Sequence, residues 1–306
     1  MTQVGTRSTQ HVPEDPFAGN GPPEKTPALR LHWPEYLMEA GELCLFMISA
    51  GLFATLVEYP GSPVRQAVSD PLLRRALMGA AMGLTAAALI YSPWGQQSGA
   101  HMNPALTVAF WRIGKVESPD ALWYVLFQFA GGLAGVGLTA VVLGDSFAEP
   151  PVSYVVTVPG AAGVAVAFLA ETAIAFGLML LVLYSTNSER FARYTGLFAG
   201  LLLAVYITLE SPFSGTGLNP ARTFASALPS GIWTAGWVYF LAPVLGMLLA
   251  GEAFRWSRHR GKARCAKLNH HTKRRCIFRC GYRESPLTTE APFANSGIPK
   301  GGVDVS

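Results

Sequence analysis

The sequence has little charge and few cysteines. Only 14% of its 306 residues are charged, whereas 50% are apolar, and the mean hydropathy of +0.30 is high for a soluble globular protein. The four cysteines are Cys44, Cys265, Cys276 and Cys280. Three of them lie in a basic tail that we expect in the reducing cytoplasm, so no disulfide framework is predicted. The composition therefore favours a membrane protein without disulfides.

Other functional signatures are absent as well. Residues 1–33 have no apolar core ahead of a cleavage site, so they are not a signal peptide. They contain five prolines, and we expect them to form a disordered cytoplasmic arm. The chain has no nucleophile–base pair and no phosphate-binding loop, and its apolar segments contain no metal cluster. We therefore expect no enzyme activity and no nucleic-acid partner.

Six apolar segments predict an all-α membrane protein. A helix needs about 20 apolar residues to cross a hydrocarbon core of about 30 Å. We expect a membrane domain over residues 34–255, with repeats at about 36–144 and 160–255, and a basic C-terminal tail over 256–306. The six segments are 36–57, 76–91, 121–143, 160–184, 194–209 and 233–254.

The distribution of charge predicts how these segments cross the membrane. Residues 255–283 hold eleven of the 23 lysines and arginines, whereas the connection at 144–159 has none. Because positively charged loops stay cytoplasmic, both termini should lie on the cytoplasmic side of a cell membrane (inner or plasma membrane). Arg65, Arg74 and Arg75 fall outside against this rule, and we treat them as an interfacial exception.

A twelve-residue motif occurs twice. Residues 98–109 and 214–225 share seven identical positions, including the tripeptide Asn-Pro-Ala, and the copies lie 116 residues apart. Each copy follows the second span of a three-span unit. Three spans per unit place the two halves in opposite orientation, and interrupted segments at corresponding positions of two such halves mark a transport site.

Each copy predicts the start of a short helix. Asparagine is a preferred N-cap residue, and proline is favoured at the first helical position. The segments 103–111 and 219–228 span only about 15 Å, so each reaches the middle of the bilayer, one from either side. The side-chain oxygen of each asparagine should accept a hydrogen bond from a first-turn backbone N–H. Its NH2 group should then stay free to donate outward. Carbonyls of the glycine-rich segments 98–102 and 214–218 are expected to line a lumen.

These motifs resemble the two signature loops of the aquaporin (major intrinsic protein) family, and the chain looks like its bacterial-type water channels. The resemblance covers residues 36–254. It implies an aquaporin-like fold of six transmembrane helices and two re-entrant half-helices in an inverted 3+3 repeat, assembled as a homotetramer. It also implies that Glu39 and Glu171 support the re-entrant loops, the second of which contains Gly217. The implied pore motifs are Asn103, Pro104, Ala105, Asn219, Pro220 and Ala221.

The resemblance implies a passive channel that conducts water and excludes protons. Two helix N-termini that meet head to head each carry about half a positive charge, and their field opposes hydronium and other cations. A water that accepts hydrogen bonds from both asparagine amides cannot at that moment accept one from a neighbouring water. We expect no cofactor for this activity and a lipid bilayer around the protein.

The permeant stays open between water and small neutral solutes. The outer constriction that the resemblance implies consists of Arg222, Ile207, Thr216 and either Met82 or Gly83. Strict water channels of the family usually have histidine at the position of Ile207, so this residue favours glycerol or other neutral solutes. Glycerol-conducting relatives usually carry aspartate at the position of Thr223, so that residue favours water.

An ion-coupled secondary transporter is a further alternative, because that class also uses inverted repeats with broken helices. Coupling usually needs carboxylates around a site, and those of Glu39, Glu42, Glu171 and Glu210 are few and scattered. A structural role for them is favoured. His101 precedes the first motif, where a pore-lining role and a structural role are equally open.

The tail contains a cluster of cysteine and histidine. Cys265, His270, Cys276 and Cys280 lie within 16 residues and can supply four ligands to a structural zinc ion, although their spacing matches none of the paired C-x2-C types. A bound zinc would tie the tail near the pore mouth or make it respond to redox state. The alternative is a basic juxtamembrane tail that contacts lipid headgroups.

Overall fold

The computed structural model describes residues 27–257, 263–270 and 274–284. Of the predicted arm at residues 1–33, residues 1–26 lie outside the described part of the chain. The described residues form helices and loops, with no strand among them. The long helices are α1 (Ala28–Glu58), α3 (Pro71–Tyr91), α6 (Ser118–Leu143), α8 (Val164–Thr186), α9 (Thr195–Leu209) and α12 (Gly236–Trp256).

Short helices complete the described chain. The two half-helices are α5 (Pro104–Arg112) and α11 (Pro220–Ser230). The others are α2 (Pro63–Ala67), α4 (Pro93–Ser98), α7 (Asp145–Ala148), α10 (Ser211–Ser214) and the 3-10 turns η1 (Ser153–Val155), η2 (Ala192–Tyr194) and η3 (Gly281–Glu284).

The six predicted spans are confirmed, because six helices in the described chain are long and apolar enough to cross a membrane. Three of them, α1, α3 and α6, begin earlier than their apolar segments, and the shift is larger in α1 and α3. Helix α1 begins at Ala28, within the stretch predicted as a disordered arm, because His32 and Tyr36 both hydrogen-bond Asp120 on α6 at 2.7 and 2.6 Å. Helix α3 begins at Pro71, where the Asp70 carboxylate caps the first turn. Polar contacts therefore extend both helices beyond what hydropathy indicates.

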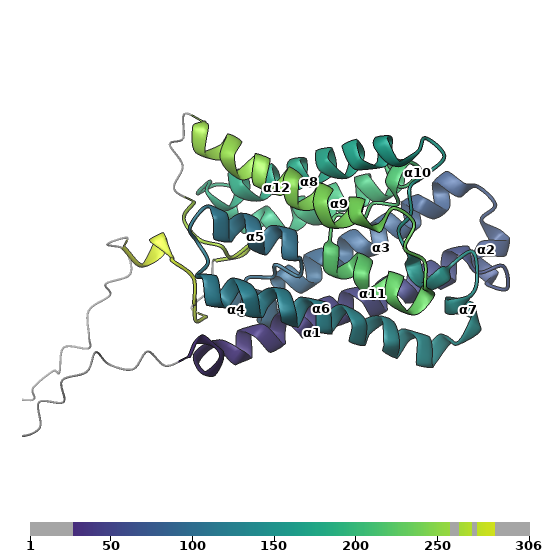
Figure 1. Cartoon of the computed structure of the whole chain (residues 1–306), viewed down its shortest axis with the longest axis horizontal. Coiled ribbons are helices and arrows are strands. Elements are labelled where there is room, and N and C mark those ends of the chain that lie inside the picture. The colour runs from purple at the N-terminus through teal and green to yellow at the C-terminus, as the bar shows by residue number, and fades with distance from the viewer. Residues whose placement is uncertain (1–26, 258–262, 271–273, 285–306) are drawn as a thin grey trace, which may run out of the picture.

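The helices pack in pairs that interlock the two repeats (Figure 1). Helix α1 lies along α6, α8 along α12, and α3 of the first repeat along α9 of the second. Each half-helix then packs on the last helix of the other repeat: α5 contacts α12, and α11 contacts α6. This exchange carries both half-helices into the centre of one bundle.

The contact between α3 and α9 depends on glycine. A Cβ atom on Gly83 would lie 2.4 Å from the carbonyl oxygen of Gly200, and one on Gly200 would lie 2.4 Å from that of Gly83. Without side chains at these two positions the helix backbones touch, as small residues allow in membrane helix pairs.

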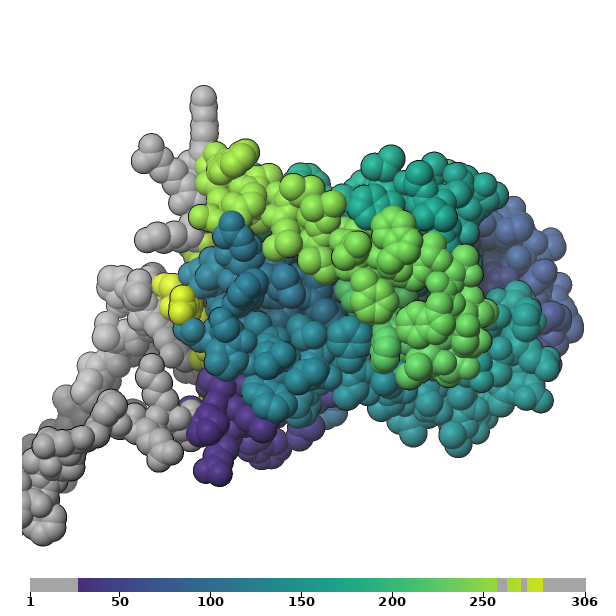
Figure 2. Space-filling view, viewed as in Figure 1, coloured from purple at the N-terminus to yellow at the C-terminus, as the bar shows by residue number. Residues whose placement is uncertain are grey.

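The tail lies at one end of the bundle and the loops with α2, α7 and α10 at the other (Figure 1). We call these the tail end and the far end. In Figure 2 the yellow atoms of the described tail lie against the left end of the helical body. Arg112, Lys115 and Arg264 belong to the tail end, whereas Arg74 and Arg75 begin α3 at the far end.

The far-end arginines are tied to the fold. Arg74 is buried, pairs with Glu58 at 3.2 Å and donates to the carbonyls of Val68 and Ser69. The Nε group of Arg75 donates to the carbonyl of Thr208 on α9. Hydrogen bonds within the fold account for Arg74 and Arg75, two of the three arginines that are exceptions to the charge pattern.

Candidate functional site

Each Asn-Pro-Ala motif caps a half-helix. Asn103 and Asn219 have extended backbones, with φ of −155° and −144°, and the proline after each begins the helix. Their side-chain oxygens accept hydrogen bonds from the amides of Ala105 at 2.9 Å and Ala221 at 3.0 Å. Both alanines are fully buried, so these bonds form out of solvent. The sequence places the N-caps correctly because the capping rule is local.

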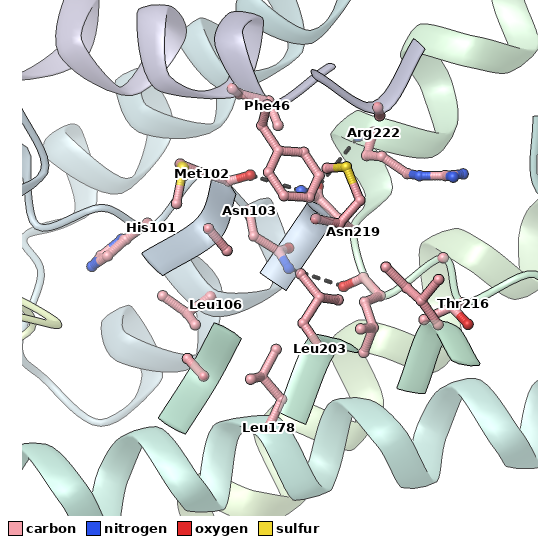
Figure 3. A pocket seen from close by; sticks show the side chains of 18 of the residues that line it. Phe46, His101, Met102, Asn103, Leu106, Leu178, Leu203, Thr216, Asn219 and Arg222 are labelled. Atoms are coloured by element: carbon pink, nitrogen blue, oxygen red, sulfur yellow. Dashed lines mark hydrogen bonds between the residues drawn. The ribbon is translucent and has the colours of Figure 1, made fainter. Parts of the chain in front are cut away.

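The two caps are also bonded to one another's loops. The Asn103 amide donates to the carbonyl of Leu218 at 2.9 Å, and the Asn219 amide donates to the carbonyl of Met102 at 2.7 Å (Figure 3). Each bond reaches the residue just before the other asparagine. The N-termini of α5 and α11 therefore meet in the middle of the bundle.

This reciprocal pair corrects one expectation from the sequence. The NH2 groups are not entirely free, because one of the two N–H bonds of each asparagine is used across the repeat interface. One N–H per asparagine remains for the cavity that both residues line. The pair of donors is thus held in a fixed orientation by the backbone of the opposite loop.

The loops before the motifs share an unusual backbone. Ala100 and Met102 in the first loop, and Thr216 and Leu218 in the second, all have φ between 49° and 58°. Non-glycine residues rarely adopt this left-handed region, which costs of order 1–3 kcal/mol each unless surrounding contacts hold it. The same alternation in both loops turns successive carbonyls to different sides, so two of them become available to the asparagine amides.

Two buried glutamates hold these loops in place. Glu39 accepts from the amides of His101 at 2.8 Å and Met102 at 2.6 Å. Glu171 accepts from the amides of Gly217 at 2.5 Å and Leu218 at 2.7 Å. Both carboxylates are fully buried and receive hydrogen bonds, which is the arrangement expected for a structural support.

Gly217 fits only because it has no side chain. A Cβ atom at this position would lie 2.6 Å from the ring of Tyr239 and 3.1 Å from the Glu171 carboxylate. The residue therefore lets Glu171 approach the loop backbone.

Sequence reasoning missed a second symmetric pair of supports. The Tyr124 hydroxyl donates to the carbonyl of Ser98, and the Tyr239 hydroxyl donates to the carbonyl of Ser214, both at 2.6 Å. Ser98 and Ser214 are corresponding residues of the repeated motif, and the tyrosines follow them by 26 and 25 residues. Extending the repeat comparison past the motif finds both.

A cavity of about 230 Å³ runs past both asparagines. Figure 3 shows His101 toward one side of it and Arg222 and Thr216 toward the other, with the asparagines between them. Much of its apolar wall comes from stripes with four-residue spacing on α3 and α9, as one face of a helix requires. These stripes are Met78, Met82, Ala86 and Ile90 on α3 and Ala199, Leu203 and Ile207 on α9.

The residues predicted for the outer constriction all line this cavity. They are Arg222, Ile207, Thr216 and Met82. Of the two alternatives on α3, Gly83 instead packs against the backbone of α9, so Met82 is the cavity residue. Met78 and Phe46 line the cavity as well and were missed; the four-residue spacing from Met82 is the signal that finds Met78.

Thr216 and Arg222 differ in whether they can donate a hydrogen bond to a permeant. The Thr216 hydroxyl donates to Glu210 at 2.6 Å, so its proton is not available to a permeant. One terminal nitrogen of Arg222, Nη1, is buried and has no hydrogen-bond partner among the described residues. Because Arg222 lines the cavity and a guanidinium carries five N–H donors, the residue as a whole can donate to a solute in the cavity.

His101 lines the cavity but its ring is fully bonded. Its Nε2 nitrogen donates to the carbonyl of Ala266 in the tail at 2.9 Å, and its Nδ1 nitrogen is 3.0 Å from the Thr107 hydroxyl. The ring also stacks on Phe110 and on Phe278 of the tail. The two roles left open for His101 are therefore combined, because a cavity residue also anchors the tail.

The tail brings its cysteines and histidine together. Ligand atoms of Cys265, His270, Cys276 and Cys280 all lie within 4.8 Å of one another. The Cys265 and Cys276 sulfurs are 3.5 Å apart, and the Cys280 sulfur is 3.0 Å from the His270 Nε2 nitrogen. A zinc ion with Zn–S bonds of about 2.3 Å in a tetrahedron separates its sulfurs by about 3.8 Å. The cluster is close to this geometry.

The electrostatics of the cluster favour thiolates. A hydrogen bond from Cys265 lowers the pKa of Cys276 to about 4 and the pKa of Cys280 to about 6. The same hydrogen bonds, with burial, raise the pKa of Cys265. The hydrogen bonds therefore favour the thiolate form, which is the form that binds metals, at Cys276 and Cys280.

Comparison with known proteins identifies close matches to this architecture. A sequence model of the family described as Major intrinsic protein matches residues 39–254. Aquaporin A of Dictyostelium discoideum is 34% identical over 194 residues, which are 62% of this chain and 68% of that protein. Aquaporin AqpM of Methanothermobacter thermautotrophicus is 33% identical over 193 residues, 58% of this chain and 75% of that protein. The X-ray structure of the aquaglyceroporin from Plasmodium falciparum has the same fold, with a TM-score of 0.63 and 20% identity over 74% of this chain and 96% of that one.

Proposed function

Since the chain belongs to the major intrinsic protein family, whose members are channels and not enzymes, we propose that it is a passive pore that conducts water and excludes protons and other ions. The observation that carries this proposal is the reciprocal bonding of Asn103 and Asn219 across the centre of the cavity. It fixes two amide donors where the positive ends of two helix dipoles meet.

The chemistry of the cavity fits single-file water. A water at the centre gives its oxygen to the remaining N–H groups of Asn103 and Asn219, so it cannot accept a hydrogen bond from the next water. The walls at this level, such as Leu178 and Leu203, offer no alternative partner. The chain of hydrogen bonds along which a proton would move is thereby interrupted, and the positive field opposes hydronium.

A channel for glycerol or other small neutral solutes is the second candidate. Ile207 and Met82 give the outer constriction an apolar side, which suits the carbon backbone of a polyol. Arg222 lines the same cavity, and its guanidinium group would supply a donor for hydroxyl groups. An ion-coupled transporter is less favoured, because Glu39 and Glu171 are already engaged by loop amides.

Stopped-flow light scattering of proteoliposomes distinguishes the candidates. Vesicles with the full chain, treated with a zinc chelator, should shrink in sucrose much faster than protein-free vesicles. In glycerol, a water-selective pore gives the same shrinkage followed by slow reswelling, whereas rapid reswelling would overturn water selectivity. Shrinkage in sucrose at the protein-free rate would reject both channel candidates.

We further propose that the protein lies in a cell membrane (inner or plasma membrane) as a homotetramer, with the tail end on the cytoplasmic side. The basic residues of the tail end support this orientation, since positive charge stays cytoplasmic. Light scattering of the detergent-solubilised protein should give the mass of four chains, and a monomer mass would contradict the assembly.

The tail is proposed to hold one structural zinc ion. Three sulfurs and one imidazole nitrogen within 4.8 Å form a complete tetrahedral ligand set. Elemental analysis of protein purified without a polyhistidine tag should find about one zinc per chain, and Cys276→Ser should lose it. Absence of stoichiometric metal in the unmodified chain would end this proposal, while Cys44→Ser, outside the cluster, is the control that keeps its metal.

A further inference from the structure

The tail occupies the mouth of the cavity at the tail end. Leu268 lines the same cavity as Asn103 and Arg222, although it follows Asn103 by 165 residues. It is only 4% exposed. A residue of the C-terminal tail is thus part of the pore wall, and the cavity carries side chains from Leu268 at one end to Arg222 at the other.

Backbone groups of the tail form hydrogen bonds with polar groups of the first pore loop. The Leu268 amide donates to the carbonyl of Gly99 at 3.1 Å, and the Ala266 carbonyl accepts from the His101 ring at 2.9 Å. Gly99 and His101 lie just before Asn103 on the path that a permeant would follow. With the tail in place, these polar groups bond to protein instead of to water.

Apolar side chains complete the closure. The Phe278 ring stacks on the His101 ring with centroids 5.4 Å apart and planes 11° from parallel, and it meets Tyr124 edge-on. Leu268 and Phe278 are both buried. A mouth filled by apolar side chains and with its polar groups already bonded gives water no favourable contact, so it acts as a hydrophobic constriction.

The tail is fastened around the mouth on several sides. Arg279 pairs with Glu117 before α6, Arg264 pairs with Glu189 after α8, and Arg275 donates to the carbonyl of Leu31 at the start of α1. These elements surround the opening, so the tail spans the mouth and is not attached along one edge. Exposed ion pairs contribute little individually, and an additional constraint is therefore needed to hold the segment closed.

The Cys–His cluster supplies that constraint. The described tail contains one short 3-10 turn and no other helix or strand, so it has little structure of its own. Cys265 directly precedes the stretch with Ala266 and Leu268, and Phe278 lies between Cys276 and Cys280. A metal bound by all four ligands would join the two stretches that close the mouth, and small segments with few apolar contacts commonly fold only around a metal.

We propose that residues 263–270 and 274–282, held together by a bound zinc ion, form a plug that closes the tail-end mouth of the pore, and that loss of the metal opens it. This rests on the channel function and the zinc site proposed above. The plug makes the water permeability of the membrane depend on zinc. A plug seated about nine-tenths of the time lowers permeability about tenfold relative to a channel that is always open.

The test measures osmotic water permeability and zinc content on the same full-length protein in liposomes. Zinc-loaded wild type is compared with wild type treated with a membrane-permeant zinc chelator, and with Cys276→Ser, Leu268→Gly and the control Cys44→Ser. We expect permeability to rise about tenfold on chelation and in Cys276→Ser, and to fall again when zinc is restored to the wild type. Leu268→Gly should raise permeability while keeping its zinc, whereas Cys44→Ser should match the wild type.

The outcomes distinguish a failure of the plug from a failure of the channel function or of the zinc site. Fast water flux that is equal with and without bound zinc, and equal in Leu268→Gly, overturns the plug and leaves the channel and the zinc site standing. Absence of zinc from the purified wild type overturns the metal site and, with it, the metal-dependent plug. Protein-free rates in every sample, including Cys276→Ser, overturn the channel function.

Discussion

Glu171 fixes the second pore loop through the amides of Gly217 and Leu218 and the hydroxyl of Ser214. All three donors require an acceptor, and a carboxylate provides acceptors only. Glu171→Gln replaces one oxygen with an NH2 group that faces an N–H. The unsatisfied donor should destabilise the fold by about 1–3 kcal/mol, seen as a lower apparent Tm in detergent.

Glu149→Gln is the matched control for this change, because Glu149 is exposed in the connection before α8. Its Tm should equal that of the wild type. A Glu171→Gln variant with an unchanged Tm and unchanged water flux would show that the carboxylate does not support the loop.

Ile207 sets the apolar character of the outer constriction. A histidine there adds a donor next to Arg222 and removes an apolar contact for the carbons of a polyol. Ile207→His should lower glycerol permeability about tenfold, equivalent to about 1.4 kcal/mol in the barrier, with water flux kept within about twofold. Stopped-flow reswelling in glycerol measures the first and shrinkage in sucrose the second. Equal glycerol permeability in both proteins would remove Ile207 from the selectivity site.

The half-helices act through their dipoles and their asparagine caps. Asn219→Asp keeps an acceptor for the first-turn amides but cannot donate to the Met102 carbonyl, and it places a negative charge where about half a positive charge stood. We expect proton and small-cation conduction to appear in this variant. A pH-sensitive dye inside the liposomes records the proton flux under an imposed pH gradient.

Asn219→Ser is the neutral control for the half-helix. Serine still caps the helix, keeps a hydroxyl donor and adds no charge, so it should leave the vesicles proton-tight. Proton flux that is equally high in the serine variant would trace the exclusion to the amide and not to the charge, against the electrostatic account.

The close backbone contact between α3 and α9 leads to a prediction about stability. Gly83→Ala adds a Cβ atom that would lie 2.4 Å from the backbone of α9, so the helices must move apart at a cost of about 1–3 kcal/mol. Gly137→Ala, on α6, meets no atom within 4 Å and serves as the control. Thermal unfolding in detergent should give a lower Tm for Gly83→Ala only. Equal values for the two variants would contradict close packing at this crossing.

The sequence predicts those elements whose signals are local or repeated. Hydropathy finds six spans, and the Asn-Pro pair finds two helix starts, because capping and proline geometry depend on neighbouring residues alone. Residues 28–33 fall in the predicted disordered arm but belong to α1, since nothing local indicates that His32 bonds to Asp120 on a distant helix. Helix ends that depend on long-range polar contacts escape a hydropathy analysis.

At the scale of the whole molecule, the arrangement of the repeats was predictable and the position of the tail was not. The repeated motif indicates two inverted halves, but the bond from Asn103 to Leu218 appears only once the halves interlock. The tail has no periodic pattern, so its contact with His101 and the cavity position of Leu268 have no signal in the sequence. Only the cysteine and histidine spacing indicated that the tail is ordered.

The account of the whole molecule depends on water passing between two half-helix tips without carrying protons. Water flux and proton flux measured together on one batch of zinc-free proteoliposomes test it most directly, with light scattering for volume and an entrapped pH dye for protons. The account predicts shrinkage far faster than in protein-free vesicles and a dye signal that stays at the protein-free level under a pH gradient. A rapid pH change carried by the unmodified protein, or shrinkage no faster than that of empty vesicles, would contradict it.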